Sequence, residues 1–417
     1  MKEIQVLILA GGVGKRMWPV TANKILLPFL GKPLIFYTLE RLRESGFKNL
    51  IVVVNPQIRR EIEKLDGELK IVTLEEPLGQ ADAILNAERI IQDAPLLIVN
   101  GDDFYDSSLL VELRKRSNSE VDALLVGVRT KSYLPMGYLI TKNGEVKEIV
   151  EKPGPGNEPS DMVRLVVDFF KNPKLLFEFL KENKNKRDKA YEIALSLMMR
   201  KGIKFGLVRY EDSWATIKYP WDILKITEFL LAKKKDELGK NRKDIKILKG
   251  AVVKNSYLGK GVVVGNHALI RDSIIEDNCV IGFNTEIARS YIGPNCWFHA
   301  NYIGDSVLER DVSFGSGART ANLRLDEREI TVEKNGEEIS TGRSKLGAII
   351  GCNVRVGINT SLMPGVMIGR GSFIGPGLIL GKTLDEGQFC YRRENLIVKK
   401  NLRKVNFETR KKFKKKI

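Results

Sequence analysis

The sequence is poor in the residues that build disulfide frameworks and zinc sites. Its 417 residues include only four cysteines and two histidines. The cysteines, at positions 279, 296, 352 and 390, have no close pairing along the chain, which argues against both kinds of site. We therefore expect the protein to work in a reducing, cytoplasmic setting.

Long apolar runs are also missing. No stretch approaches the roughly 20 apolar residues that span a bilayer, and the apolar segment 6–10 is too short for the core of a signal peptide. The composition, 43% hydrophobic and 29% charged, is that of a globular protein. We expect a soluble protein without a membrane span, and the chain length predicts two domains.

Positive charge is plentiful but unevenly placed. The formal net charge is +17, and residues 392–417 hold 12 Lys or Arg against 2 Glu. We interpret residues 386–417 as a solvated basic tail, with nucleic acid or acidic membrane lipid as weaker alternatives. The smaller positive charge of the body suits anionic small substrates.

A glycine-rich loop follows the apolar segment 6–10. Its three glycines lack the β-carbon that would keep a phosphate away from backbone N–H groups, and the cations Arg16 and Lys24 follow them. The glycines are Gly11, Gly12 and Gly14. The pattern predicts a cradle for a triphosphate rather than an ordinary strand-to-helix turn.

Together with Leu-Pro-Phe-Leu-Gly-Lys-Pro at 27–33, this loop resembles the signature of the sugar-1-phosphate nucleotidylyltransferases. The resemblance implies a nucleoside triphosphate and a sugar 1-phosphate as substrates. It further implies that Ala10 and the three glycines hold the nucleotide, that Arg16 steadies the leaving pyrophosphate, and that Lys24 lies against the α-phosphate. Asn23 departs from the family, which has proline there.

Residues 1–230 are expected to form an α/β domain with a Rossmann-like, largely parallel mixed sheet, because short apolar segments alternate with amphipathic ones. Ligands of such sheets bind at the carboxyl ends of the strands. The expected strands are 6–10, 50–55, 96–100 and 123–128, and the expected helical stretches include 34–45 and 80–91.

Asp102 follows one of these strands in the sequence Asn-Gly-Asp-Asp at 100–103. A carboxylate in that turn can reach a magnesium ion that bridges phosphates. Family members carry a metal-binding Asp in this context, so the resemblance implies that Asp102, rather than Asp103, holds Mg²⁺.

Further family motifs concern the base and the sugar. Gly79, in the segment 75–83, matches the glycine whose backbone meets the base, but Gln80 and Leu74 differ from the residues of uridylyl- and thymidylyl-transferring members. The identity of the nucleobase is therefore undetermined, although the sequence Glu-Glu-Pro-Leu-Gly at 75–79 is closest to that of guanylyltransferases. Glu151 and Lys152 match the family's Glu-Lys-Pro, which implies contacts to sugar hydroxyls and to the sugar phosphate.

Three positions depart from the family in the sugar and metal sites. Arg164 stands where the family has Asn, and Leu197 and Thr216 stand where it has Asp. The Asp replaced by Thr216 is the family's second metal ligand. Because a hydroxyl binds magnesium more weakly than a carboxylate, nucleotidyl transfer is at risk, and Arg164 is a hypothetical substitute cation at the sugar phosphate.

Beyond a basic linker, 231–249, apolar residues recur every five or six positions through residues 250–385. That period predicts a solenoid with triangular coils. It resembles the left-handed parallel β-helix of hexapeptide-repeat acyltransferases, an all-β fold that implies a homotrimer or a multiple of trimers. The repeat is interrupted by an inserted arm, 321–349, with an Asn335-Gly336 hairpin turn.

His299 lies in the sequence Phe-His-Ala-Asn-Tyr-Ile-Gly-Asp at 298–305. This stretch resembles the signature of bifunctional hexosamine-1-phosphate acetyltransferases, including the archaeal type fused to a nucleotidyltransferase domain. The resemblance implies that His299 is the base toward the amine that attacks acetyl-CoA, a role suited to an imidazole. Further matches to this site are Arg271 as a phosphate ligand, Tyr302, Asn322 and Lys345, whereas Ala288 replaces a sugar-phosphate lysine, with Arg289 beside it.

The leading interpretation is a bifunctional enzyme that acetylates a hexosamine 1-phosphate and couples a sugar 1-phosphate to a nucleotide. One alternative is nucleotidyl transfer alone, with the β-helix as a structural trimerising device. Another is a non-catalytic regulatory or scaffold homologue, which Arg164, Leu197 and Thr216 favour.

Overall fold

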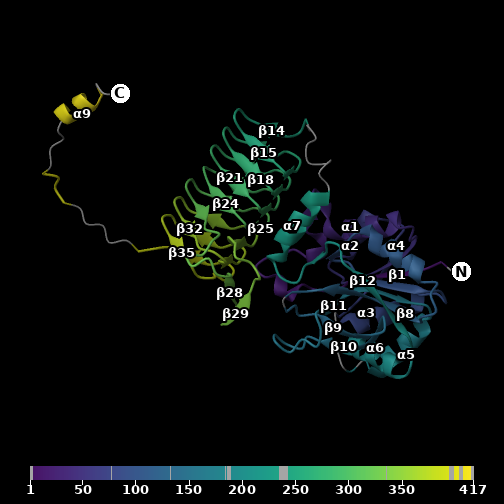
Figure 1. The fold of residues 1–417 in the computed structure, drawn as a ribbon. Helices are drawn as coiled ribbons and strands as arrows, with labels where there is room; N and C mark the ends of the chain where they lie inside the picture. Colours follow the sequence, from purple (N-terminus) through teal and green to yellow (C-terminus); the bar gives the residue numbers. More distant parts are fainter. Residues whose placement is uncertain are drawn as a thin grey trace.

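The computed structural model describes residues 3–76, 78–131, 133–183, 185, 189–233, 243–334, 336–393, 399–402 and 407–414. It contains an α/β domain and a triangular β-helix that lie side by side, with the chain passing once from one to the other (Figure 1). The segments 234–242, in the predicted linker, and 394–398, 403–406 and 415–417, in the predicted tail, lie outside the described residues.

A mixed sheet of nine strands forms the centre of the α/β domain. In spatial order the strands are β5 (Lys70–Thr73), β4 (Asn49–Val54), β1 (Gln5–Ala10), β6 (Leu96–Asn100), β11 (Met162–Phe170), β8 (Ala123–Arg129), β12 (Phe205–Tyr210), β10 (Glu145–Glu151) and β9 (Gly137–Lys142). The first four strands in this order pair in parallel, and β11 runs antiparallel to both of its neighbours. Strand β12 is parallel to β8, and β9 and β10 form an antiparallel edge.

The four strands expected from the sequence are all present, but a largely parallel sheet is confirmed only for the half around β1. The central antiparallel strand β11 is buried along all nine residues, although it carries Arg164 and Asp168. A strand buried on both faces has no alternation of polar and apolar residues, so its direction is not legible in the sequence.

Helices cover both faces of this sheet and enclose two apolar cores, one on each face. The helices are α1 (Leu34–Glu44), α2 (Arg59–Leu65), α3 (Gln80–Ala87), α4 (Ser107–Arg116), α5 (Pro173–Asn183), α6 (Ala190–Arg200) and α7 (Asp222–Lys233). The short elements of this domain are η1 (Lys15–Met17), η2 (Lys24–Leu26), β2 (Pro28–Phe29), β3 (Lys32–Pro33), η3 (Glu88–Ile90), β7 (Asp103–Phe104) and β13 (Ala215–Thr216).

The repeat region forms a parallel β-helix of three sheets, consistent with the left-handed hexapeptide fold. The first sheet contains β14 (Lys246–Ile247), β17 (Val263–Val264), β20 (Val280–Ile281), β23 (Trp297–Phe298), β26 (Ser313–Phe314), β31 (Arg355–Val356), β34 (Phe373–Ile374) and β36 (Phe389–Cys390). The second contains β15 (Val252–Lys254), β18 (Leu269–Arg271), β21 (Glu286–Ala288), β24 (Tyr302–Gly304), β27 (Arg319–Thr320), β32 (Ser361–Leu362) and β35 (Ile379–Leu380). The third contains β16 (Tyr257–Leu258), β19 (Ile274–Ile275), β22 (Tyr291–Ile292), β25 (Val307–Leu308), β30 (Ile349–Ile350) and β33 (Met367–Ile368).

The predicted interior positions of the repeat are buried and form one apolar core. Thr320 is the polar exception, and its hydroxyl accepts a hydrogen bond from the Gly304 N–H at 2.9 Å. Burial of a hydroxyl is tolerated there because the hydroxyl is hydrogen-bonded. The first parallel strand begins at Lys246, inside the segment expected to be linker, and the last ends at Cys390.

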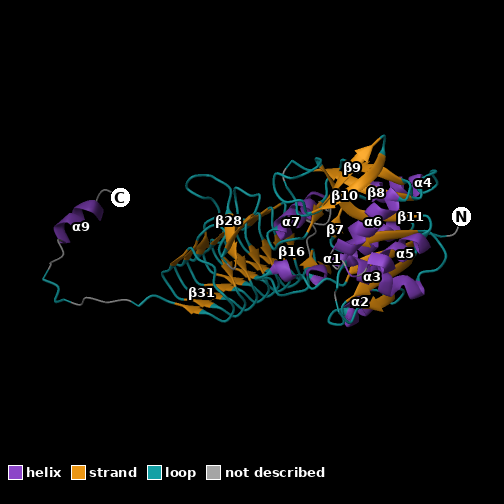
Figure 2. Ribbon diagram, turned by 90° about the horizontal axis from the view of Figure 1, so that it is seen from below, coloured by secondary structure: helices purple, strands orange, loops and turns teal. Residues whose placement is uncertain are grey.

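The inserted arm contains an antiparallel hairpin, β28 (Thr331–Lys334) with β29 (Glu337–Ser340). Gly336 has a φ of +80°, which suits a tight turn, and its partner in the expected turn, Asn335, lies outside the described residues. In Figure 2 the hairpin projects from the β-helix near α7.

The third sheet of the β-helix packs on the α/β domain. Outward-facing Ile274, Tyr291, Val307, Ile349 and Met367 are buried in the same core as β1 and α1. The two domains therefore share an apolar interface rather than being joined only by a linker.

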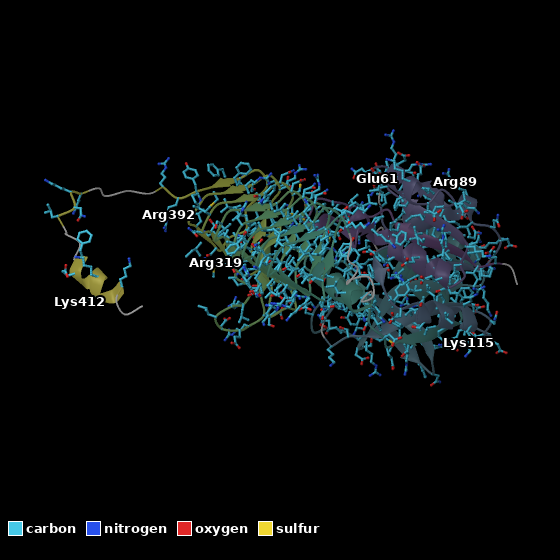
Figure 3. The ribbon with its side chains drawn as sticks, turned by 90° about the horizontal axis from the view of Figure 1, so that it is seen from above. Glu61, Arg89, Lys115, Arg319, Arg392 and Lys412 are labelled. Carbon is cyan, nitrogen blue, oxygen red and sulfur yellow. The ribbon has the colours of Figure 1, made fainter. Side chains whose placement is uncertain are left out.

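No helix within the described ranges is long and apolar enough to cross a bilayer. The start of the predicted tail belongs to the β-helix, because β36 pairs with β34, and α9 (Phe407–Lys414) lies apart from both domains (Figure 1). Figure 3 shows Arg392 and Lys412 on this segment, far from Glu61, Arg89 and Lys115 on the α/β domain.

Candidate functional site

The glycine loop follows β1 at the carboxyl edge of the sheet. A β-carbon on Gly11 would lie 2.7 Å from Leu74 Cδ1, and Gly14 has a φ of +65° at the start of η1. Both positions therefore favour glycine for steric reasons. A β-carbon on Gly12 would meet no atom within 4 Å, so the backbone there borders open space.

That open space is a cavity of about 530 Å³ between the glycine loop, η2, the end of β6 and the start of α3. Eight residues predicted from the sequence line it, contributed by four separate segments of the chain. They are Ala10, Gly11, Gly12, Gly14, Arg16, Lys24, Gly79 and Asp102. The fold thus brings together the predicted nucleotide, pyrophosphate and metal contacts.

Lys24 and Asp102 meet at the floor of this cavity through an ion pair between the ammonium group and the carboxylate. Burial alone would raise the pKa of Asp102, but the positive charges of Lys24 and Lys218 hold its pKa below the ordinary value. Asp102 is therefore an anion at neutral pH, as a magnesium ligand must be.

Asp103 points away from the cavity. It is 1% exposed, and Asn100 donates a hydrogen bond to its Oδ2 at 2.9 Å. Burial raises its pKa, and the neighbouring Asp102 carboxylate adds to this effect, while Lys218 opposes it. Of the two adjacent carboxylates, Asp102 is the one that faces the cavity.

Thr216 lies beside this pair, because β13 pairs with β7 and sets Thr216 opposite Asp103. Its hydroxyl oxygen is buried. Within the described residues no cluster of three or more His, Cys, Asp or Glu could hold a metal ion. Magnesium often takes one or two carboxylates and completes its shell with phosphates and water, so Asp102 in a phosphate cavity fits that ion.

Glu151 and Lys152 are paired with each other, with Nζ 2.9 Å from Oε1. Neither Glu151 nor Lys152 is among the described residues that line the cavity beside the glycine loop. Lys152 has a φ of +47°, an uncommon conformation for lysine. The structure therefore holds the predicted sugar contacts as a pair outside the nucleotide cavity.

The expectation that Arg164 contacts the sugar phosphate is wrong. Its side chain is 2% exposed and lies between two buried carboxylates, 3.4 Å from Asp168 and 3.5 Å from Glu192. Its guanidinium carbon lies 4.7 Å from the centre of the Tyr191 ring. Asp168 and Glu192, neither of which the sequence reasoning considered, neutralise this cation inside the domain and leave it unavailable to a ligand.

Leu197 on α6, the third departure from the family, is partly buried and packs against the apolar core beside that cluster. A carboxylate at this position would be desolvated there, so the leucine is compatible with its surroundings. It contributes packing and no polar contact.

A second group of predicted residues meets on the second sheet of the β-helix. The Asn322 side-chain amide donates to the Tyr302 hydroxyl at 3.3 Å and also contacts the Asp305 carboxylate. Arg289 binds the two oxygens of Asp305 through two hydrogen bonds of 2.7 Å. The cluster of Tyr302, Asn322, Asp305 and Arg289 is called the sheet-two cluster below.

His299 and Arg271 lie outside the sheet-two cluster. His299 is exposed at the turn before β24, with its ring 6.1 Å from that of Trp297. Arg271 lies on β18 and forms an ion pair with Glu286 at 2.8 Å. A single chain therefore does not gather all the predicted acetyl-transfer residues at one point.

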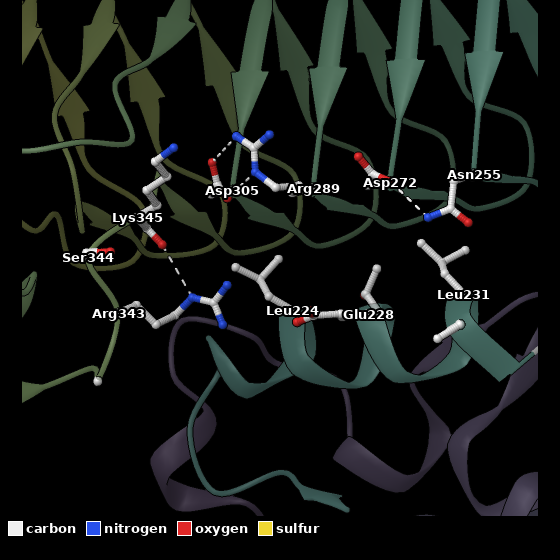
Figure 4. A pocket seen from close by; sticks show the side chains of 13 residues that line it. Leu224, Glu228, Leu231, Asn255, Asp272, Arg289, Asp305, Arg343, Ser344 and Lys345 are labelled. Carbon is white, nitrogen blue, oxygen red and sulfur yellow. Dashed lines mark hydrogen bonds and ion pairs between the residues drawn. The ribbon is translucent and has the colours of Figure 1, made fainter. Parts of the chain in front are cut away.

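Lys345 on the arm lines a cavity of about 710 Å³ between the β-helix and α7. Figure 4 shows Leu224, Glu228 and Leu231 on α7 facing Arg289 and Asp305 across this space. Lys345 also bridges to Leu323 through the backbone, which ties the base of the arm to the β-helix. The cavity places the arm cation near one edge of the sheet-two cluster.

Sequence reasoning missed Lys218 and Glu228, both of which line cavities. A signal for Lys218 existed, because it is a cation only two residues after Thr216, where the family's metal-binding carboxylate is missing. Glu228 had no such signal, since it is an ordinary charged residue on an amphipathic helix.

Comparisons with known proteins agree with this geometry. The family described as nucleotidyl transferase matches residues 5–233, and the bacterial transferase hexapeptide, in six repeats, matches residues 347–382. A bifunctional sugar-1-phosphate nucleotidylyltransferase/acetyltransferase of Sulfurisphaera tokodaii is 30% identical over 93% of this chain and 99% of its own. Proteins described as bifunctional protein GlmU from Methanococcus vannielii and Methanocaldococcus jannaschii are each 29% identical over 95% of this chain and 100% of their own.

Proposed function

This chain belongs to the nucleotidyl transferase family and, over most of its length, to the group of bifunctional sugar-1-phosphate nucleotidylyltransferase/acetyltransferases. On this premise we propose that it is an enzyme with two activities. The α/β domain couples a nucleoside triphosphate to a sugar 1-phosphate and releases pyrophosphate. The β-helix transfers an acetyl group from acetyl-CoA to the amine of a hexosamine 1-phosphate.

In nucleotidyl transfer an oxygen of the sugar phosphate attacks the α-phosphorus in line. A new phosphorus–oxygen bond forms as the bond to the bridging oxygen of the β-phosphate breaks, and pyrophosphate leaves. Such reactions depend on positioning and charge neutralisation. Under this proposal the glycine-loop amides hold the phosphates, Lys24 neutralises the α-phosphate, and Arg16 holds the leaving pyrophosphate.

Asp102 is the proposed magnesium ligand, together with the substrate phosphates. When bound, Mg²⁺ would neutralise charge on the phosphate oxygens. Glu151 and Lys152 are proposed to bind the sugar hydroxyls and the sugar phosphate. Their position on β10 and just after it, outside the nucleotide cavity, supports a sugar site that is separate from that of the base.

In acetyl transfer the amine nitrogen attacks the thioester carbonyl, the carbon–sulfur bond breaks, and CoA leaves as the thiol. His299 takes the proton that the amine loses and returns it to the sulfur of the departing CoA. Tyr302 and Asn322 are proposed to bind the amino sugar, and Arg271 and Lys345 its phosphate. Because His299 is exposed and lies outside the sheet-two cluster, we propose a homotrimer, or a multiple of trimers, in which neighbouring chains complete each site.

The proposal includes a cytoplasmic location and small-molecule partners rather than nucleic acid. All four cysteines lie within the described residues, and all are free thiols, which supports a reducing setting. The basic tail is proposed to be a solvated segment.

The observation that carries the proposal is the convergence of eight predicted residues on one cavity, with Lys24 against Asp102. The test measures pyrophosphate release with Mg²⁺, each of the four nucleoside triphosphates, and a panel of hexose and hexosamine 1-phosphates. Release with one pairing would support nucleotidyl transfer and name its substrates. Silence across the panel, with release of CoA thiol intact, would leave acetyl transfer alone, and silence in both assays would favour a non-catalytic homologue.

A further inference from the structure

The segment that carries Lys24 lies outside the nine-stranded sheet. Lys24 begins η2, which is only three residues long and is capped by a hydrogen bond from the Ile25 N–H to Asn23 Oδ1. A single turn of this kind has little stability of its own. The position of the Lys24 ammonium group therefore depends on what holds the flanking residues.

Glu309, in the turn after β25 of the β-helix, holds the residues before Lys24. Its Oε1 accepts hydrogen bonds from the Thr21 hydroxyl and the Ala22 N–H, both at 2.9 Å. Its Oε2 accepts from the Thr21 N–H and from the Cys352 N–H, both at 3.0 Å. Glu309 is 4% exposed, so these four donors replace the water that a carboxylate otherwise binds.

A second contact holds the residues after Lys24. The Tyr291 hydroxyl donates to the Pro28 carbonyl at 2.8 Å, and its ring lies 5.2 Å from that of Phe29. The Gly31 N–H donates to Glu276 Oε2 at 3.1 Å. The β-helix thus binds the chain on both sides of η2, while Lys24 itself points to Asp102 within the α/β domain.

We propose that Glu309 is a positioning residue for nucleotidyl transfer: it fixes Thr21 and Ala22 so that Lys24 meets Asp102 and the α-phosphate. The β-helix is then part of the nucleotidyltransferase site as well as the carrier of acetyl transfer. This inference rests on the proposed nucleotidyl transfer. Its physical basis is that a misplacement of about 1 Å at a reacting group can cost about a hundredfold in rate.

Glu309→Gln is the informative variant, because it keeps the volume but turns one carboxylate oxygen into an NH₂ group that faces two donors. Asp311→Asn is its matched control: it lies two residues away, and its carboxylate binds Arg310 rather than the α/β domain. We expect Glu309→Gln to lower kcat for pyrophosphate release by about ten- to a hundredfold. The KM for the triphosphate, the midpoint of thermal unfolding and acetyl transfer should stay close to those of the control.

A double-mutant cycle with Lys24→Arg separates positioning from general damage. If Glu309 acts through Lys24, adding Glu309→Gln to Lys24→Arg should lower kcat by much less than it does in the wild-type background. Equal losses in both backgrounds, wild-type kcat in folded Glu309→Gln, or parallel loss of both activities would overturn the proposal.

Hydrogen exchange keeps the two proposals distinguishable. Should the wild-type protein release no pyrophosphate, the proposed function fails, while the anchoring of the Lys24 segment can still be measured. Amides 21 and 22 should then exchange at least tenfold faster in Glu309→Gln than in Asp311→Asn. Equal exchange rates would overturn the role of Glu309.

Discussion

The ammonium group of Lys24 contacts the carboxylate of Asp102, although 78 positions separate them in the chain. Lys24 lies between the two stretches that the β-helix anchors, and Asp102 follows the end of β6 by two residues. Their contact therefore depends on how the glycine loop, η2 and the end of β6 are arranged around the nucleotide cavity. It also joins the proposed phosphate contact to the proposed metal ligand.

Replacing Asp102 should stop nucleotidyl transfer without unfolding the protein. Asp102→Asn keeps the size of the side chain but removes the charge that would bind Mg²⁺, so we expect a loss of about a hundredfold or more in kcat. Asp106→Asn is the control, because Asp106 pairs with Lys233 near the surface. Steady-state pyrophosphate release measures both, and a rate for Asp102→Asn within twofold of the control would rule out Asp102 as the ligand.

Restoring a carboxylate at Thr216 should strengthen magnesium binding. Thr216 lies opposite Asp103 in the β7–β13 pair and close to Lys218, whose charge can accommodate a new anion. We expect Thr216→Asp to lower the Mg²⁺ concentration for half-maximal rate by about tenfold, and Thr216→Ser to leave it unchanged. A magnesium titration of pyrophosphate release is the measurement, and an unchanged or higher requirement in Thr216→Asp would contradict the idea that the hydroxyl weakens the metal site.

Much of the fold could be predicted from the sequence because apolar residues recur in it at regular intervals. The five- or six-residue spacing places an aliphatic side chain at each interior corner of the β-helix, and the structure buries them as expected. The direction of β11 could not be predicted, because the apolar pattern of a strand that is buried on both faces is the same for a parallel and an antiparallel strand. The shared interface was hidden for a related reason: Tyr291 and Ile274 fit the repeat, and nothing local shows that another domain covers them.

Local motifs located the nucleotide cavity but not the contacts that cross between domains. The glycine loop and Asp102 follow from strand ends, where parallel strands gather ligands. Arg164 was misread because its partners, Asp168 and Glu192, come from β11 and α6 and become neighbours only in the folded chain. Nothing in the local sequence around Glu309 shows that it contacts Thr21 and Ala22, for the same reason.

Acetyl transfer should depend on His299 and not on the other histidine. We expect His299→Ala to lower acetyl transfer by about a hundred- to ten-thousandfold, as for the loss of a general base, while pyrophosphate release stays unchanged. His267→Ala is the control, because His267 is also exposed on the β-helix, with its ring 6.0 Å from that of Phe283. Release of CoA thiol is the readout, and an equal effect of the two variants would remove His299 from the mechanism.

Stability should fall as the pH rises through the titration of Glu276 at the domain interface. Burial raises its pKa from 4.5 to about 8. The stability that this group contributes is therefore complete below about pH 4.5, falls as the pH rises from there, and is lost once the pH has passed through about 8. Glu276→Gln lacks this titration, so its midpoint of thermal unfolding should rise relative to wild type between about pH 5 and about pH 9. Parallel curves over that range would show that Glu276 is not buried in its protonated form.

Arg164 should matter for stability rather than for substrate affinity. Arg164→Met would leave the buried carboxylates of Asp168 and Glu192 without a counter-charge, which typically costs about 3–5 kcal/mol. A variant that also carries Asp168→Leu and Glu192→Met should recover most of this loss, because no buried charge remains. Denaturant unfolding measures the effect, and a stable Arg164→Met with a raised KM for the sugar phosphate would restore Arg164 as a ligand.

One chain is expected both to acetylate an amino-sugar phosphate and to couple a sugar phosphate to a nucleotide. The most direct measurement supplies the full-length protein with a hexosamine 1-phosphate, acetyl-CoA labelled in the acetyl group, Mg²⁺ and each nucleoside triphosphate in turn. With one of the triphosphates we expect a nucleotide sugar that carries the labelled acetyl group, together with CoA thiol and pyrophosphate. Folded protein that releases neither CoA thiol nor pyrophosphate with any of the four would contradict it.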